Sequence, residues 1–68
     1  MTWLELPEPE RRQLSRRLTA KQLDIYRLRM NRCSYEEIAW LLNISVRTVR
    51  THEFRAKQVH HAMLEEAA

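Results

Sequence analysis

A short polar run near the middle of the chain holds side chains that are suited to contacting a nucleic acid. Two arginines and two threonines fall close together there, namely Arg47, Thr48, Arg50 and Thr51. An arginine guanidinium can donate two hydrogen bonds to guanine O6 and N7 or to a phosphate, and a threonine can contact a phosphate or a thymine methyl group. Arg55 and Lys57 follow one or two helical turns later, where we expect contacts to phosphates. These residue types at this spacing predict binding to DNA.

The charge of the chain is distributed unevenly, and this distribution agrees with a polyanionic ligand. The 68 residues include 12 Lys and Arg against 9 Asp and Glu, which leaves a formal net charge of only +3. The segment 47–57 nevertheless holds four cations and a single acid, Glu53, whereas other acids gather near both ends. A clustered basic face is the electrostatic footprint of a nucleic-acid-binding protein, although a solvated helix face is the commoner origin of a charge run.

These side chains need helices to position them, and the sequence predicts an all-α fold with four. The apolar residues recur at helical spacing, glycine is absent, and both prolines stand near the start, where a helix tolerates them. Thr19 with Gln22 and Ser34 with Glu37 have the spacing of capping boxes, and Ser45 is suited to be the N-cap of the last helix. We expect one small domain over residues 1–68, with helices at about 8–17, 20–31, 35–42 and 46–65 and no winged elements.

The last two expected helices are close enough to form a helix-turn-helix. Ala39 is small where the two backbones would approach, and Asn43 tolerates the left-handed backbone that the turn needs. The second helix would then present its N-terminal half to the major groove, and the first would meet the DNA backbone at its own N-terminus. The candidate DNA-binding residues are therefore Ser34, Tyr35, Ser45, Val46, Arg47, Thr48, Arg50, Thr51, Arg55 and Lys57.

The stretch from Leu18 to about Ala56 resembles two families of bacterial DNA-binding domain. It contains Leu-Thr before an apolar helix, then Glu-Ile-Ala, a leucine, Ile-Ser, and Thr-Val followed by a basic residue. LuxR-type response regulators and region 4 of sigma-70-type factors share this pattern. Region 4 is the better match, because no break follows the recognition helix and another helix precedes Leu18. Three residues depart from the pattern: Asn43 and Arg32 stand where glycine is usual, and Glu53 stands where an apolar residue is common.

The resemblance implies sequence-specific binding of double-stranded DNA, in transcription regulation or promoter recognition, by a recognition helix in the major groove. It also implies RNA polymerase as a candidate partner. Two alternatives stay open. One is a protein-interaction module that contacts RNA polymerase or a sigma factor instead of DNA. The other is the DNA-recognition subunit of a phage packaging or recombination complex. In each case we expect a bacterial or phage protein that works in the cytoplasm.

Two aromatic residues are not explained by DNA binding. Trp40 lies off the apolar face of its helix, and Phe54 lies in the polar part of the last helix. For Trp40 we favour cover by the first helix or by the N-terminal tail, in which Trp3 and Leu4 would pack on the core. The alternative is that Trp40 and Phe54 contact another protein, and a second copy of this chain, forming a homodimer, is one candidate.

The sequence contains no pattern typical of catalysis, metal binding or membrane insertion. The letters HEFRA begin at His52, but Ala56 stands where a zinc-binding HExxH motif needs its second histidine. No base lies near Cys33 in the sequence, so we expect neither an enzyme nor a resident metal or cofactor. No apolar run approaches ~18 residues, and so short a chain leaves little core for a deep pocket. We therefore expect neither a membrane partner nor a small-molecule substrate.

Overall fold

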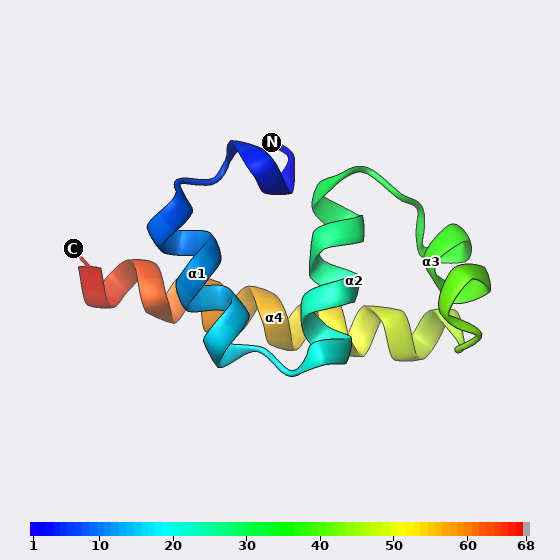
Figure 1. The fold of residues 1–68 in the computed structure, drawn as a ribbon. Helices are drawn as coiled ribbons and strands as arrows, with labels where there is room; N and C mark the ends of the chain where they lie inside the picture. The colour runs from blue at the N-terminus through cyan, green and yellow to red at the C-terminus, as the bar shows by residue number, and fades with distance from the viewer. Residues whose placement is uncertain (68) are drawn as a thin grey trace.

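Helices joined by short turns make up residues 1–67, the part of the chain that the computed structural model describes (Figure 1). A single 3-10 turn, η1 (Trp3–Glu5), precedes four α-helices: α1 (Glu8–Arg17), α2 (Ala20–Met30), α3 (Tyr35–Leu42) and α4 (Val46–Ala67). Residues 1–67 contain no strand, and the predicted all-α fold is confirmed. α2 ends one residue before the expected position, and α4 extends two residues beyond it.

α4 runs along the length of the molecule, and the other three helices pack against it. Its 22 residues span about 33 Å, close to the longest dimension of the fold, 36 Å. Figure 1 shows α3 beside the N-terminal end of α4, α2 across its middle, and α1 across its C-terminal half. The two halves of α4 therefore have different supports, and the N-terminal half is the one held by α2 and α3.

Side-chain caps begin the helices where the sequence predicts them. Thr19 Oγ1 accepts a hydrogen bond from Gln22 N at 3.2 Å, and Gln22 Oε1 accepts one from Thr19 N at 3.1 Å. Ser34 and Glu37 repeat this pair of bonds at 3.0 and 3.1 Å. Ser45 Oγ accepts a backbone amide hydrogen bond from the first turn of α4 at 3.1 Å. A cap of this kind contributes about 0.5–2 kcal/mol, so each serine or threonine fixes a helix start.

Two residues with left-handed backbone turn the chain in place of glycine. Arg32, after α2, has a φ of 68°, and Asn43, after α3, has φ 55° and ψ 49°. Ile44 N then donates to Ala39 O at 3.0 Å and closes the turn between α3 and α4. Both positions are those at which the sequence departs from the expected glycine. The chain keeps the backbone shape of that pattern and accepts a conformational cost that glycine would avoid.

A fully buried apolar cluster fixes the angle between α3 and α4. Ile25 of α2, Ile38 of α3 and Val49 of α4 have no exposed surface and pack on one another. Burying each of these side chains contributes about 1.5–3 kcal/mol relative to leaving it in water. The cluster lies directly behind the first turns of α4, which makes that part of the helix a rigid support for its outward side chains.

A second cluster joins α1 and the N-terminal residues to the C-terminal half of α4. Its buried members are Trp3, Leu6, Leu14, Leu18, Tyr26, Ala56 and Met63. The predicted packing of Leu4 on this core is wrong, because Leu4 is 77% exposed. In η1, with about three residues per turn, Trp3 takes the inward position and its neighbour points away.

Polar contacts of His60 join α1, α2 and α4. Tyr26 Oη and His60 Nδ1 lie 2.7 Å apart, and His60 Nε2 lies 3.2 Å from Glu10 Oε2. His60 of α4 therefore bridges α2 and α1.

Within the described residues, no helix combines the length and the apolar character needed to cross a bilayer.

Candidate nucleic-acid interface

The N-terminal half of α4 carries most of the predicted DNA-binding residues, and helix geometry assigns each one to a side. Val49 and Ala56 are fully buried and mark the side that faces the core. With 3.6 residues per turn, Arg47, Thr51 and Phe54 lie on the opposite side. All three are exposed. This side of α4 therefore points away from the protein and is open to a ligand.

Two pairs of residues border this outward side. Arg50 and Lys57 are seven residues apart on one flank, and both are exposed. Thr48 and Arg55 share the other flank, where Thr48 is half-buried and Arg55 is exposed. Val46 is also half-buried, which leaves it less accessible than the arginines around it. We call the following seven residues the outer face of α4: Arg47, Thr48, Arg50, Thr51, Phe54, Arg55 and Lys57.

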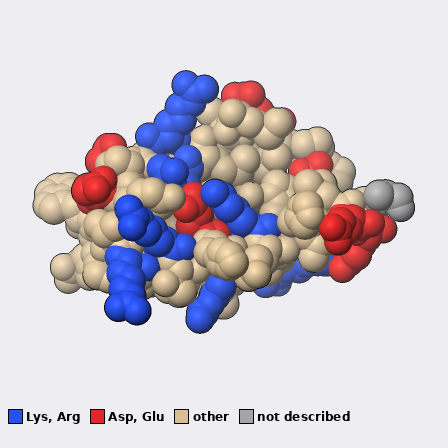
Figure 2. All heavy atoms as spheres, turned by 180° about the vertical axis from the view of Figure 1, so that it is seen from behind, with Lys and Arg blue, Asp and Glu red and all other residues tan. Residues whose placement is uncertain are grey.

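Cations gather over one half of the molecule, although acidic side chains lie at both ends. Figure 2 shows several Lys and Arg side chains close together over the half of the molecule that lies away from the C-terminus of α4. Acidic side chains group at the other end, where Glu65 and Glu66 are exposed and Glu66 pairs with Arg17 at 2.8 Å. A field of this form attracts a polyanion to the N-terminal half of α4 rather than to its C-terminal end.

The hydroxyl groups of the outer face are engaged within the protein. Thr51 Oγ1 donates to Arg47 O at 3.1 Å. Thr48 Oγ1 and Ser45 Oγ lie 2.8 Å apart and share a hydrogen bond in which either can be the donor. A phosphate oxygen only accepts hydrogen bonds, so Thr51 must release its present acceptor before it can donate to one. Contact through its methyl group needs no such exchange.

Glu53 is a buried acid at the centre of the contact between α2, α3 and α4. The residue is only 6% exposed. Its Oε2 accepts a hydrogen bond from Arg29 Nε at 2.9 Å and its Oε1 accepts one from Tyr35 Oη at 2.8 Å, while Lys57 Nζ lies 3.6 Å away. Burial alone raises the pKa of Glu53, but the hydrogen bonds from Tyr35 and Arg29 and the two positive charges outweigh it and hold that pKa below its usual value. The carboxylate is therefore ionised at neutral pH.

Tyr35 connects this buried acid to the outer face. The Arg29 guanidinium lies 4.1 Å from the centre of the Tyr35 ring, and the Arg50 guanidinium lies 5.0 Å from it. The hydroxyl of Tyr35 is committed to Glu53. The predicted contact of Tyr35 with the DNA backbone, at the N-terminus of α3, stays a prediction, and the Tyr35 ring lies beside the Arg50 guanidinium.

Sequence reasoning missed Arg29 and read Glu53 only as a departure from the pattern. A signal was nevertheless present, because Glu53 falls on the same helical stripe as Val49 and Ala56, which are apolar. A carboxylate on a buried stripe requires a buried donor, and a cation on a neighbouring helix is the usual one.

Ser34, the remaining predicted contact, is the N-cap of α3 and is half-buried. Its side chain accepts the Glu37 amide at 3.0 Å, and Glu36 and Glu37 both lie in the first turn of the helix. These carboxylates oppose the attraction that a helix N-terminus has for an anion. A phosphate contact at this end therefore has to come from the Ser34 side of the turn, away from the two acids.

Trp40 is exposed, and the favoured prediction that it is covered is wrong. Its exposed fraction is 83%, and that of its neighbour Leu41 is 55%. α1 lies over the other half of α4, so neither it nor η1 reaches the outer side of α3 (Figure 1). Glu36, Glu37, Trp40 and Leu41 together line an open cavity of about 420 Å³. Phe54, which is 55% exposed, belongs instead to the outer face of α4.

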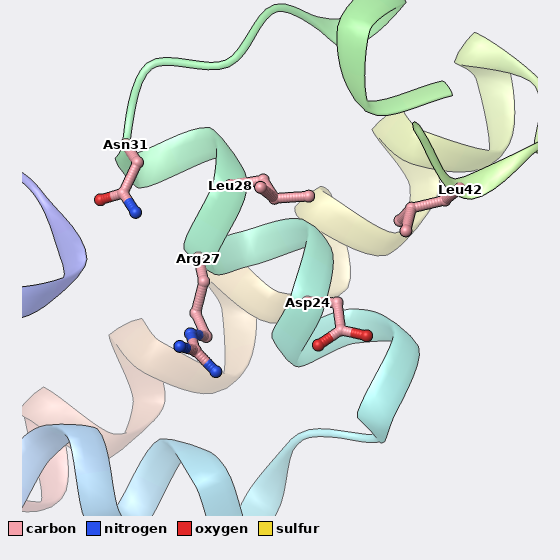
Figure 3. Close-up of a pocket in the computed structure, with 5 residues that line it drawn as sticks. All are labelled: Asp24, Arg27, Leu28, Asn31 and Leu42. Carbon is pink, nitrogen blue, oxygen red and sulfur yellow. The ribbon is translucent and has the colours of Figure 1, made fainter. Parts of the chain in front are cut away.

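A second open pocket, of about 300 Å³, lies between α2 and α3. In Figure 3, Leu28 and Leu42 point toward one another across it. Two other lining residues hold the N-terminal segment in place: Asn31 Oδ1 accepts a hydrogen bond from Trp3 N at 3.0 Å, and the Arg27 guanidinium lies 5.6 Å from the Trp3 ring centre. Asn31 and Arg27 therefore have a structural role, because they hold the N-terminal segment against α2.

Residues 1–67 contain no group of three or more His, Cys, Asp or Glu side chains able to hold a metal ion.

The chain matches the family model described as "Sigma-70, region 4" over residues 12–58, which is more than half of its length. The matched range includes α2, α3 and the outer face of α4. Domains of this family are helix-turn-helix domains that bind DNA in transcription and are not catalytic. The match confirms the region 4 interpretation of the sequence. Comparison with curated proteins and with solved structures gave no match.

Proposed function

Because the chain belongs to the sigma-70 region 4 family, we propose that residues 1–68 act as one domain that binds double-stranded DNA sequence-specifically, in promoter recognition or transcription regulation. α4 enters the major groove with its outer face toward the base edges, as the second helix of a helix-turn-helix does. One observation carries the proposal. The outer face exposes Arg47, Arg50, Arg55 and Lys57 on a helix whose other side is anchored in the fully buried cluster of α2, α3 and α4.

Position along the helix separates base contacts from phosphate contacts. Arg47 and Arg50 lie in the first two turns, which reach deepest into a groove, and each can donate two hydrogen bonds to guanine O6 and N7. Arg55 and Lys57 lie further along and meet phosphates at the groove edge. Thr51 contacts a thymine methyl group, because its hydroxyl already donates to Arg47 O. Phe54 lies on the same side as Thr51 and adds apolar contact with the bases or sugars.

Contacts to the phosphates of the DNA backbone come from the start of α3 and from the turn before α4. Ser34 approaches a phosphate from the side of its turn that faces away from Glu36 and Glu37. Ser45 and Val46 begin α4, where unpaired backbone amides favour an anion. Tyr35 acts through Arg50 rather than through its own hydroxyl, which Glu53 holds.

Selection of bound sites from a pool of random duplex DNA tests this function directly. We expect a short consensus to be enriched, and we expect the Arg50→Ala variant to bind the enriched duplex at least tenfold more weakly in a fluorescence anisotropy titration. Arg12→Ala is the matched control, because Arg12 is an exposed arginine on α1 that pairs only with Glu8 among the described residues. Failure to enrich any sequence, or equal losses in the two variants, would rule out recognition by the outer face.

A specific observation also favours a protein contact on α3. Trp40 and Leu41 are exposed side by side and line the open cavity with two carboxylates, those of Glu36 and Glu37. Exposed tryptophan is rare on a surface that meets only water, and large aromatic residues dominate the energies of protein interfaces. The acidic rim makes DNA an unsuitable ligand for this surface. We propose that a segment of RNA polymerase or of a sigma factor binds there, with an apolar anchor flanked by basic residues.

Tryptophan fluorescence distinguishes this contact from DNA binding. Trp3 is buried and Trp40 is exposed, so a change in the exposed tryptophan dominates the signal. We expect the emission to shift to shorter wavelength when RNA polymerase is added, and the shift to disappear in Trp40→Ser. DNA binding should be the same in Trp40→Ser and in the wild-type chain. An emission spectrum that neither RNA polymerase nor a sigma factor changes, once the partner's own emission is subtracted, would refute the contact.

A further inference from the structure

The outer face of α4 contains one arginine whose guanidinium is held by another side chain. Arg50 lies with its guanidinium 5.0 Å from the centre of the Tyr35 ring, and no carboxylate among the described residues pairs with it. Within residues 1–67, neither Arg47 nor Arg55 lies over an aromatic ring. An arginine over an aromatic ring is held by the ring's negative face and by stacking of the two planar groups. Arg50 is therefore the arginine of this face whose guanidinium is held by an aromatic ring, while Lys57 lies near the Glu53 carboxylate.

The Tyr35 ring is in turn fixed from two directions. Its hydroxyl donates to Glu53 Oε1 at 2.8 Å, and its ring centre lies 4.1 Å from the Arg29 guanidinium. Arg29 cannot move away readily, because its Nε donates to Glu53 Oε2 at 2.9 Å and its Nη1 donates to Cys33 O at 2.8 Å. Glu53 is the common acceptor for Tyr35 and Arg29, and it joins α2, α3 and α4 at one point.

A buried carboxylate is a costly side chain at this position. Removing a carboxylate from water costs several kcal/mol before its partners return that energy, and replacing a buried ion pair by apolar side chains is often neutral or stabilising. The stripe on which Glu53 lies is otherwise apolar, with Val49 and Ala56 on either side. What Glu53 supplies, and a leucine would not, is a fixed pair of hydrogen-bond acceptors for Tyr35 and Arg29.

We propose that Glu53 is a positioning residue for DNA recognition: it orients Tyr35, and through the Tyr35 ring it holds the Arg50 guanidinium on the outer face in the conformation that binds DNA. This inference rests on the proposed DNA-binding function. A free arginine loses most of its rotamer freedom when it binds a base or a phosphate, and pre-orientation removes much of that loss before binding. The expected gain is about 5- to 20-fold in affinity.

A double-mutant cycle on DNA binding tests the proposal. The duplex enriched by selection is titrated with the wild-type chain, Glu53→Leu, Arg50→Ala and the double variant. Glu53→Leu should weaken binding about 5- to 20-fold, Arg50→Ala should weaken it at least as much, and the double variant should bind no more weakly than Arg50→Ala alone. Circular dichroism melts should show that Glu53→Leu keeps its helices at the titration temperature.

Tyr35→Phe gives a second route that keeps the ring and removes only its hydroxyl, and the same cycle with Arg50→Ala applies if Glu53→Leu fails to fold. Additive losses, unchanged binding in Glu53→Leu, or tighter binding in that variant would each overturn the positioning role. Tighter binding in particular would mean that release of Lys57 from the Glu53 carboxylate outweighs any orientation of Arg50. If Arg50→Ala weakens binding and Glu53→Leu does not, DNA recognition stands and only the positioning role fails. If the wild-type chain enriches no duplex, both proposals fail.

Discussion

The affinity for DNA should fall steeply with salt, and removal of a single cation from α4 should reduce that dependence by a defined step. Arg47, Arg50, Arg55 and Lys57 are exposed along about 15 Å of helix. Duplex DNA carries one negative charge per ~1.7 Å of its axis, so enough phosphates lie within reach of all four. Lys57 Nζ is 3.6 Å from the Glu53 carboxylate and is partly neutralised. We therefore expect three to four neutralised phosphates.

The number of neutralised phosphates determines how steeply the affinity for DNA falls with salt. Each neutralised phosphate contributes about −0.9 to the slope of log affinity against log salt, which gives a slope of about −2.7 to −3.6. A fourfold rise in salt, from about 50 to about 200 mM, should then lower the affinity about 40- to 150-fold. Arg55→Gln removes one charge without shortening the side chain greatly, and it should make the slope shallower by about 0.9.

The assay is a fluorescence anisotropy titration of the selected duplex at five salt concentrations and neutral pH. Arg12→Gln is the control, because it removes the same charge from α1, far from the outer face of α4, and should leave the slope of the wild-type chain unchanged. A wild-type slope shallower than about −1 would refute electrostatic contact through α4. Equal changes in Arg12→Gln and Arg55→Gln would show that only the net charge of the chain matters.

Three further predictions concern the fold that supports this face. Arg32→Gly should raise the free energy of unfolding in urea by about 0.5–1 kcal/mol, because Arg32 has a φ of 68° that glycine adopts freely; a loss of stability would contradict this account of the turn. His60→Ala should lower that free energy by about 1–3 kcal/mol, because it leaves Tyr26 Oη and Glu10 without their partner, and an unchanged urea midpoint would exclude the bridge. The folded-state pKa of Glu53 is lowered, so its contribution to stability is complete above the usual glutamate pKa of about 4.3 and is lost as the pH falls through the lower, folded value. Urea titrations between about pH 6 and pH 3 should therefore show a smaller loss of stability in Glu53→Leu than in the wild-type chain, and parallel curves would contradict the ionised buried carboxylate.

The elements that local chemistry controls could be predicted from the sequence. Thr19, Ser34 and Ser45 begin helices because their side chains cap the amides that follow, and that relation depends only on spacing along the chain. Asn43 could be assigned to the turn because few residues tolerate a left-handed backbone. Helical spacing of the apolar residues predicts that the last helix buries one side, and in the structure Val49 and Ala56 are buried while Arg47 and Thr51 face outward.

The features that depend on packing between helices could not be predicted in the same way. Whether α1 covers Trp40 depends on where α1 crosses α4, and nothing in the spacing of its own residues sets that position. Leu4 lost its predicted contact because a single 3-10 turn gave the inward position to Trp3. The pairing of Glu53 with Arg29 and Tyr35 joins residues 18 or more positions apart, so it follows from the tertiary arrangement rather than from any local pattern.

Backbone amide chemical shifts, measured by NMR during titration with the selected duplex, test the central claim most directly. The claim is that the outer face of α4 recognises DNA. We predict that the largest shifts fall in residues 45–57, with smaller ones near Ser34 and Tyr35, and that α1 and the C-terminal turns of α4 stay unchanged. Shifts concentrated around Trp40 and Leu41, or spread evenly over the chain, would contradict the account.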